Sequence, residues 1–363
     1  MQTKKPDPFI ERILANQSES RRSANDSLGR VFSEHLPTVY DEELNEQIDW
    51  MLDSIVLELG HQPGVEAPKA QMRGGRMLLV TGRAGAGKSC SLMHAFQTRD
   101  EFAGFGEEGS NSPVLSVVAP SPFTLAALGN VIIKKLGFHG DKEVKHTRVW
   151  SVVRDLMAEC GVRILHIDET QHGDEIQSAV MTQEVGNTLK RMMQEVDWPI
   201  WLILSGLPEL TRFCQKDPSM RRRVRVLHFD GLSQERNADH VLSAVRKLVE
   251  LCPTITCDEL VTTDFAHRLL HASTYQFGIV VEFIQDAIAE CLAVEGGGEL
   301  KLGHFADVYS IRTGVLDDDL NPFISGYWDS ISVETALFEP VIDEDGNATG
   351  NLRRKKRKTK GSK

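Results

Sequence analysis

Short apolar stretches alternate with longer amphipathic stretches through the middle of the chain. Five of the apolar stretches have the length of buried strands and lie at residues 77–81, 114–119, 163–167, 200–205 and 224–229. Between and around them, apolar residues recur at helical spacing, which predicts helices at residues 40–60, 88–97, 123–136, 149–160 and 177–195. Apolar strands that alternate with helices indicate an α/β fold, with a parallel sheet flanked by helices.

The segments outside this region differ in character and divide the chain further. Three more helical patterns, at residues 233–251, 262–273 and 277–294, predict a small helical lid. We therefore expect four parts: a flexible N-terminal arm or docking helix over 1–39, the sheet domain over 40–231, the lid over 232–298 and a flexible C-terminal extension over 299–363. Residues 314–345 of the extension are acidic. We expect them either to bind the basic C-terminal tail or to display Phe323, Tyr327 and Trp328 to a partner, because disordered acidic segments often fold on binding.

Composition and charge narrow the class of protein. With 41% hydrophobic and 26% charged residues, the chain has the composition of a globular protein. Its net charge of −11 does not favour nucleic-acid binding by the surface as a whole, yet residues 352–363 form a basic tail with eight Lys or Arg. The six cysteines show no metal-ligand spacing, and no apolar run has the length of a membrane span. These features predict a cytoplasmic protein with reduced thiols and no membrane partner.

The first motif with a chemical meaning follows the first predicted strand. Residues 82–89 read GRAGAGKS and fit GxxxxGK[ST], the pattern of a phosphate-binding loop (P-loop) between a strand and a helix. Glycines let backbone N–H groups turn toward phosphate oxygens, the lysine reaches the β- and γ-phosphates, and the final hydroxyl ligates Mg²⁺. The residues expected to bind ATP are Gly82, Arg83, Ala84, Gly85, Ala86, Gly87, Lys88, Ser89 and Cys90, with Ser89 also a ligand of Mg²⁺.

The second motif ends the third predicted strand. Residues 164–169 read ILHIDE, the Walker B pattern of apolar residues followed by Asp and Glu. We expect Asp168 to hold Mg²⁺, and Glu169 to orient and polarise the water that attacks the γ-phosphate. This acidic pair favours an ATPase over a small-molecule kinase, which needs no group that activates water. His166, inside the strand, is expected to be a packed core histidine.

The order and spacing of these motifs resemble those of AAA+ ATPases. The segment SGLPEL at 205–210 and the basic turn before HFDGLS at 228–233 are similar to those of the TniB/TnsC group of transposition regulator ATPases, relatives of the IstB helper proteins. The resemblance covers residues 40–295 and implies an AAA+ core that binds ATP and Mg²⁺ and hydrolyses ATP. It also implies a homo-oligomer, a ring or a helical filament, that forms on duplex DNA. Two protein partners are implied as well, a target-selecting protein and a DDE-type transposase.

The resemblance implies roles for residues outside the two motifs. Ser205, which ends the fourth predicted strand, would contact the γ-phosphate or the attacking water, although a hydroxyl there can equally cap a turn. One arginine of the basic turn would reach the γ-phosphate of a neighbouring subunit as an arginine finger, and the candidates are Arg221, Arg222 and Arg223. The alternative is a solvated basic turn. Residues 274–288 of the lid contain no arginine, unlike many AAA+ lids, and Gln276 is the nearest polar candidate there.

DNA contacts are expected in two places. By the resemblance, the region after the second predicted strand lies toward DNA, and its Lys and hydroxyl groups would contact phosphates: Ser121, Thr124, Lys134 and Lys135. The alternative is that both lysines simply form the exposed face of a helix. In the basic tail, Arg353 and Arg354 would add salt-sensitive affinity for DNA or bind an acidic partner.

Two other functions are compatible with the sequence. One is a signalling or defence ATPase that acts as a nucleotide-switched scaffold without DNA, and the basic tail argues against it. The other is a replication initiator or helicase loader. No evident helix-turn-helix follows the lid, which argues against an initiator.

Overall fold

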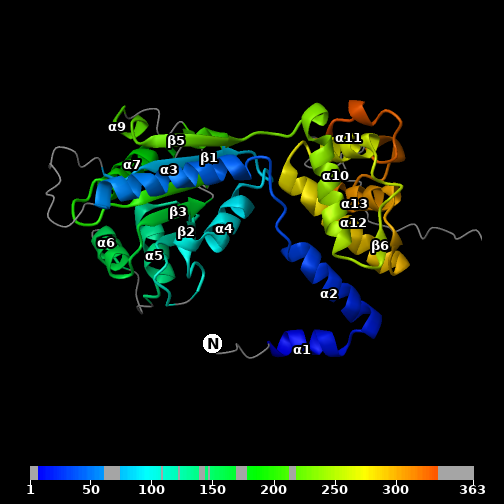
Figure 1. Ribbon diagram of the computed structural model, residues 1–363, viewed down its shortest axis with the longest axis horizontal. Helices are drawn as coiled ribbons and strands as arrows, with labels where there is room; N and C mark the ends of the chain where they lie inside the picture. The colour runs from blue at the N-terminus through cyan, green and yellow to red at the C-terminus, as the bar shows by residue number, and fades with distance from the viewer. Residues whose placement is uncertain are drawn as a thin grey trace, which may run out of the picture. The chain divides into compact units, whose positions relative to one another are not determined.

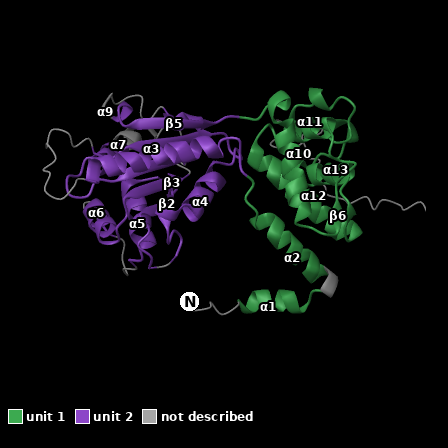
Figure 2. Cartoon of the chain, viewed as in Figure 1, with its two compact units in different colours: residues 1–36, 231–363 green, residues 37–230 purple. Residues whose placement is uncertain are grey.

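The structure of the chain, a computed structural model, describes residues 7–60, 74–107, 109–121, 123–138, 144–145, 148–168, 178–211 and 218–333, and for 19–20, 178–183 and 218–219 it describes the backbone alone. The chain divides into two compact units (Figure 2). We call residues 37–230 the core unit, and residues 1–36 together with 231–363 the helical unit.

The core unit is built on a parallel sheet with the strand order β2-β3-β4-β1-β5. Figure 1 labels β1, β2, β3 and β5 of this sheet. The strands are β1 (Met77–Gly82), β2 (Val114–Val118), β3 (Ile164–Asp168), β4 (Trp201–Gly206) and β5 (Val224–Phe229). Every pair of neighbouring strands is parallel. The carboxyl ends of all five strands therefore lie at one edge of the sheet, which is where α/β proteins bind their ligands.

Helices cover both faces of this sheet. They are α3 (Asp41–Leu59), α4 (Lys88–Thr98), α5 (Leu125–Lys135), α6 (Val149–Glu159), α7 (Ser178–Met193) and the short α9 (Pro218–Arg221). Along β1, Leu78 and Val80 pack in one hydrophobic cluster with residues of α3 and α4. Met77 and Leu79 point the other way and pack with residues of α5, α6 and α7. A strand that is apolar on both faces suits a covered parallel sheet, and the predicted α/β fold is confirmed.

The helical unit surrounds a hydrophobic core of its own. Its elements are α1 (Pro8–Ala15), α2 (Glu19–Ser33), α10 (Gln234–Glu250), β6 (Ile255–Thr256), α11 (Thr263–Ala272), α12 (Phe277–Glu295), β7 (Gly298–Glu299) and α13 (Leu302–Thr313). Buried residues of α10, α11, α12 and α13 form most of the core. A two-stranded parallel sheet, which the sequence did not indicate, pairs β6, after α10, with β7, after α12. Among the described helices, none combines the length and apolar character that crossing a bilayer requires.

The expected N-terminal arm forms α1 and α2, and α2 packs on the core of the helical unit. Val31, near the end of α2, is fully buried in its core. Gln285 of α12 donates a hydrogen bond of 3.1 Å from its side-chain amide to the carbonyl of Val31. Lys247 of α10 forms an ion pair of 2.7 Å with Glu34. α2 is therefore attached to the helices that follow the sheet in sequence.

The acidic segment differs from its expectation. Phe323 was expected to be displayed to a partner, but it is 2% exposed and lies 5.6 Å from the ring of Phe305 and 6.0 Å from that of Phe283. Tyr327 is 81% exposed. The expectation for Phe323 is wrong because an apolar ring, even within an acidic run, gains more by burial in a nearby core than the run loses by becoming ordered. Residues 334–363 lie outside the described residues.

Replacing Phe323 with Ala is expected to destabilise the helical unit by about 3–5 kcal/mol, since the change removes a buried ring and leaves a cavity. Tyr327→Ala is the matched control, because its ring belongs to the same segment and is exposed. We expect this variant to stay within about 0.5 kcal/mol of the wild type. Chemical denaturation followed by circular dichroism measures both. Equal stability of both variants would mean that the Phe323 ring is not part of the core.

Candidate functional site

The loop between β1 and α4 has the backbone shape that its glycines predict. Gly87, the residue before α4, has a φ of 99°, which side-chain-bearing residues rarely adopt. A Cβ at Gly82 would lie 2.5 Å from the carbonyl oxygen of Phe229 on the neighbouring β5. Both glycines are therefore required, one for the turn into the helix and one for the close approach of two strands.

Lys88 lies inside this loop. Its ammonium donates hydrogen bonds of 2.8 Å to the carbonyl oxygens of Gly82 and Arg83, and its side chain is buried. No side chain caps the N-terminus of α4, so backbone N–H groups and the positive end of the helix dipole face the loop. Cys90, in the first turn, is exposed. The arrangement suits an anion such as a phosphate chain.

Asp168 meets the loop from the end of β3. The Ser89 hydroxyl donates a 2.7 Å hydrogen bond to Oδ2 of Asp168. The Ser205 hydroxyl, from β4, donates to Oδ1 of the same carboxylate. A carboxylate and a hydroxyl are oxygen ligands of the kind that Mg²⁺ takes beside a phosphate chain, so this pair fits the ion. Glu169 lies outside the described residues.

His166 does more than fill the core. It is fully buried, and its Nε2 lies 2.8 Å from Oγ of Ser205 while its Nδ1 lies 2.9 Å from Oγ of Ser116. Burial lowers the pKa of His166 to about 4, although the charge of Asp168 opposes this shift. The imidazole is therefore neutral near pH 7. The sequence showed a histidine in a strand but not its partners, which come from two other strands.

Asp41, a residue that the sequence did not single out, also stabilises the start of α4. Asp41, at the start of α3, accepts hydrogen bonds from the hydroxyls of Thr38 and Ser91. Ser91 belongs to the first turns of α4, and Thr38 lies beside the loop, since a Cβ at Gly87 would be 2.8 Å from its methyl group. These contacts fix the helix that carries Lys88 and Ser89.

The basic turn lies at the opposite edge of the sheet. Arg221 to Arg223 precede Val224, which pairs with Met77, whereas the loop follows Gly82, which pairs with Phe229. At about 3.3 Å per residue, these two ends of β5 are about 17 Å apart. None of these arginines is therefore near the loop of its own chain.

The three arginines differ in their surroundings. Arg223 is partly buried, and its guanidinium donates a 3.4 Å hydrogen bond to the carbonyl of Gly75. Burial lowers the pKa of Arg223, as does the charge of Arg76, whereas Glu58 raises it. Arg221 and Arg222 are exposed. Arg223 therefore braces the sheet edge, and the other two are better placed to act outside the subunit.

The candidate DNA contacts lie around β2 and α5. Thr124 caps α5, since its hydroxyl accepts a 3.0 Å hydrogen bond from the backbone N–H of Ala127, and Ser121 is exposed. Lys134 and Lys135 are exposed at the end of α5. With Ser116, Val117, Val118 and Val131, these two lysines line a groove of about 530 Å³ beside the edge strand β2. Arg353 and Arg354 lie outside the described residues.

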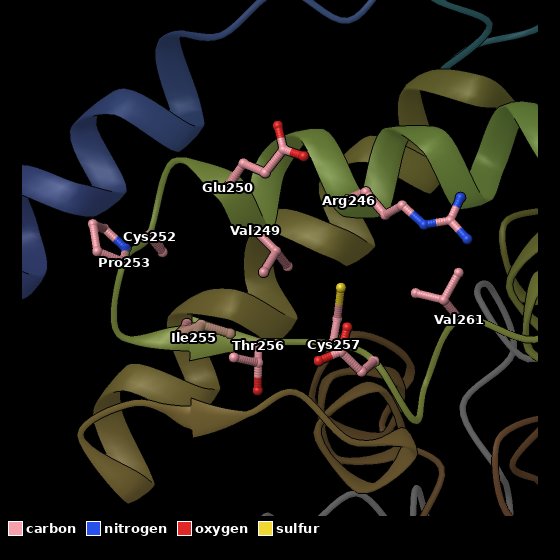
Figure 3. Close-up of a pocket in the computed structure, with 10 residues that line it drawn as sticks. Arg246, Val249, Glu250, Cys252, Pro253, Ile255, Thr256, Cys257 and Val261 are labelled. Atoms are coloured by element: carbon pink, nitrogen blue, oxygen red, sulfur yellow. The ribbon is translucent and has the colours of Figure 1, made fainter.

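Another cavity, of about 390 Å³, lies within the helical unit (Figure 3). Arg246, Val249 and Glu250 of α10 line one side of it, and the segment around Cys257 lines the other. Burial raises the pKa values of Cys252 and Cys257, so both thiols are protonated at neutral pH and are poor nucleophiles. None of the site residues expected from the sequence lines this cavity.

Residues 54–234, about half of the chain, match the family described as bacterial TniB protein. The chain is a TniB-like ATPase. No curated protein matches its sequence. The family match spans the loop at 82–89, Asp168, Ser205 and the basic turn, so the residues brought together at the sheet edge belong to the matched region.

Solved structures share the fold of this TniB-like ATPase. An ORC2 protein of Aeropyrum pernix in its ADP form is 14% identical with a TM-score of 0.54, and the match covers 80% of this chain and 75% of that one. An ORC1 protein of the same organism, in complex with DNA, is 12% identical with a TM-score of 0.54, over 81% and 70%. Cdc6p from Pyrobaculum aerophilum is 13% identical with a TM-score of 0.52, over 77% and 70%. At such identities the likeness shows the fold alone, which is that of AAA+ ATPases.

Replacing Lys88 with Ala is expected to weaken ATP binding by at least about 100-fold, because the change removes the buried ammonium group that lies inside the loop. Lys145→Ala, a change of an exposed lysine in the same unit, is the control and should bind ATP as the wild type does. Titration with a fluorescent ATP analogue measures both affinities. Unchanged affinity in Lys88→Ala, with the fold intact by circular dichroism, would exclude this loop as the phosphate site.

Proposed function

We propose that this ATPase regulates DNA transposition: with ATP it oligomerises on target DNA, and it recruits a DDE-type transposase to a site chosen by a partner protein. Hydrolysis of ATP would then control disassembly. The observation that carries this proposal is the match of residues 54–234 to the TniB family, together with a nucleotide site whose parts lie in the matched region. Resemblance of the SGLPEL segment and the basic turn to transposition regulators supports it.

In this proposal the nucleotide site acts through the residues at the carboxyl edge of the sheet. Lys88 and the N-terminus of α4 bind the β- and γ-phosphates, and Ser89 and Asp168 hold Mg²⁺. The ion, when bound, neutralises charge on the phosphate oxygens. Ser205 contacts the γ-phosphate or the attacking water, and Glu169 orients and polarises that water.

The positions of the arginines support an oligomer. Arg221 and Arg222 lie at the amino edge of the sheet, about 17 Å along β5 from the end that adjoins the loop. An arginine there can stabilise the charge of a γ-phosphate only if that nucleotide is bound by another subunit. One of these two residues is therefore the proposed arginine finger, and complete active sites would form between subunits of a ring or filament.

The groove beside β2 is the proposed contact with DNA. Its lysines, Lys134 and Lys135, would bind phosphates without reading the bases, which suits a protein that must cover many target sequences. Arg353 and Arg354 of the basic tail would add affinity that falls with salt. One of the structures that share the fold, an ORC1 protein, is a complex with DNA, which supports a DNA-binding role for a protein of this fold.

Sedimentation with long duplex DNA tests the proposal. With a non-hydrolysable ATP analogue at low salt, we expect large DNA-bound assemblies that do not form without nucleotide and that weaken at high salt. Lys88→Ala should not assemble, and Glu169→Gln should assemble with ATP itself and remain assembled. Assembly with nucleotide in the absence of DNA, and none on DNA, would instead favour a scaffold ATPase.

A separate prediction concerns the arginine finger. The double variant Arg221→Ala/Arg222→Ala should bind ATP normally and lose about 1,000-fold in kcat, because a trans-acting arginine stabilises the transition state only. Arg225→Ala is the matched control, since its guanidinium lies 4.2 Å from the ring of Trp50 on the same subunit. ATP hydrolysis on DNA is the measurement.

Mixed assemblies of two variants test whether the arginine acts between subunits. The double variant has an intact nucleotide loop, and Glu169→Gln, which is expected to assemble with ATP, has intact arginines, so mixed assemblies should regain hydrolysis that neither variant shows alone. A mixture that stays inactive, although both proteins enter the same assembly, would contradict action between subunits.

A further inference from the structure

Four polar side chains on three adjacent strands form a continuous line of hydrogen bonds through the sheet. Ser116 of β2 contacts His166 of β3 at 2.9 Å, and His166 contacts Ser205 of β4 at 2.8 Å. Ser205 then donates to Asp168, at the end of β3. The line therefore runs from the edge strand to the carboxylate that is proposed to hold Mg²⁺.

Strand register places all four groups on the same face of the sheet. Ser116 is paired directly with His166, and His166 is paired with Ile203. Side chains two residues apart in a strand share a face, so Asp168 lies on the face of His166 and Ser205 on that of Ile203. α4 covers this face: its Phe96 contacts the imidazole edge-on, with ring centroids 5.4 Å apart. The helix that begins at the phosphate loop thus also confines the imidazole.

The chemistry of the end groups sets the direction of every hydrogen bond. An ionised carboxylate only accepts, so the Ser205 hydroxyl donates to Asp168. The oxygen of Ser205 must then accept from His166, which puts the proton of the neutral imidazole on Nε2. Nδ1 is left as an acceptor and receives the hydroxyl hydrogen of Ser116. Each donor in the line has one acceptor. Because the neutral imidazole carries only one proton, reversing one bond reverses the others and turns a lone pair of the Ser205 oxygen toward Asp168.

We propose that His166 is a positioning residue of the hydrolysis reaction, which holds the Ser205 hydroxyl in place between β4 and Asp168, with Ser116 holding the imidazole in the tautomer that this requires. The inference rests on the proposed role of Ser205 at the attacking water and deepens it. A serine oxygen can accept two hydrogen bonds, so a Ser205 hydroxyl that donates to Asp168 and accepts from His166 can also accept one from that water. A serine hydroxyl rotates freely unless both its donor and its acceptor functions are engaged. A hydroxyl fixed in advance stabilises a transition state more than one that must be oriented during the reaction.

An apolar residue at position 166 would stabilise the buried strand more than His166 does. The side chain is fully buried, and its neighbours Leu165 and Ile167 are apolar and buried as well. Burying an imidazole in a sheet is unfavourable unless both of its nitrogens are hydrogen-bonded, and here both are. The structure therefore tolerates this residue only with its two partners, and one of those partners is a proposed member of the hydrolysis site.

Two amide variants separate the two nitrogens. In His166→Gln the terminal amide takes the place of Nε2 and can still donate to Ser205, whereas in His166→Asn it takes the place of Nδ1 and reaches only Ser116. We expect His166→Asn to lower kcat about tenfold or more with an unchanged Kd for ATP, since the loss affects the transition state. His166→Gln should recover most of the lost kcat. Ser116→Ala should lower kcat by a smaller factor, because the imidazole is then held at one end only.

ATP turnover on DNA and binding of a fluorescent ATP analogue are measured for each variant. Wild-type kcat in His166→Asn would overturn the inference, and so would an equal loss in the Asn and Gln variants, which indicates a general defect of packing. If His166→Asn does not fold by circular dichroism, Ser116→Ala decides, and an unchanged kcat in that variant overturns the inference. Absence of ATP turnover in the wild type would overturn the proposed hydrolysis site itself. If the wild type turns over ATP and only the variants deviate from the expected kcat values, the positioning role of His166 is overturned and the hydrolysis site is not.

Discussion

The parallel pairing of β1 with β4, and of β4 with β3, is the constraint on which the candidate site depends. Because the three strands run the same way in a continuous hydrogen-bonded register, their carboxyl ends meet at one edge. The phosphate loop, Asp168 and Ser205 are far apart in the chain, and only this pairing brings them within hydrogen-bond distance. The hydrophobic clusters on the two faces stabilise the sheet and thereby the site.

Local features of the sequence predicted a large part of this arrangement. Strand positions followed from short apolar runs, because a covered parallel strand is apolar on both faces. The motif GRAGAGKS predicted the phosphate loop, because the backbone of such a loop needs a positive φ, which glycine adopts readily, at positions such as Gly87. Asp168 followed from its place after an apolar strand. Each of these inferences needs only residues that are close together in the chain.

The features that the sequence did not predict depend on which strand or helix lies beside which. His166 was expected to be a packed core histidine, because its partners Ser116 and Ser205 are about 40 to 50 residues away in the chain. Asp41 was not singled out, since its role depends on how α3 packs against α4. Phe323 was assigned to a displayed segment because the local composition is acidic, whereas its burial depends on α12 and α13. Composition describes a segment by itself and not the surface that the segment meets.

Buried polar groups in this sheet are informative because each one opposes the stability of the fold. The sheet would be more easily built with apolar residues at Ser116, His166 and Ser205, as at their neighbours Leu115, Leu165 and Leu204. All three polar residues instead lie on the face covered by α4 and connect, through hydrogen bonds, to Asp168. Apolar and polar positions thus have different roles within one sheet. The apolar residues hold the strands in register, and the polar residues, placed by that register, orient groups at the nucleotide edge.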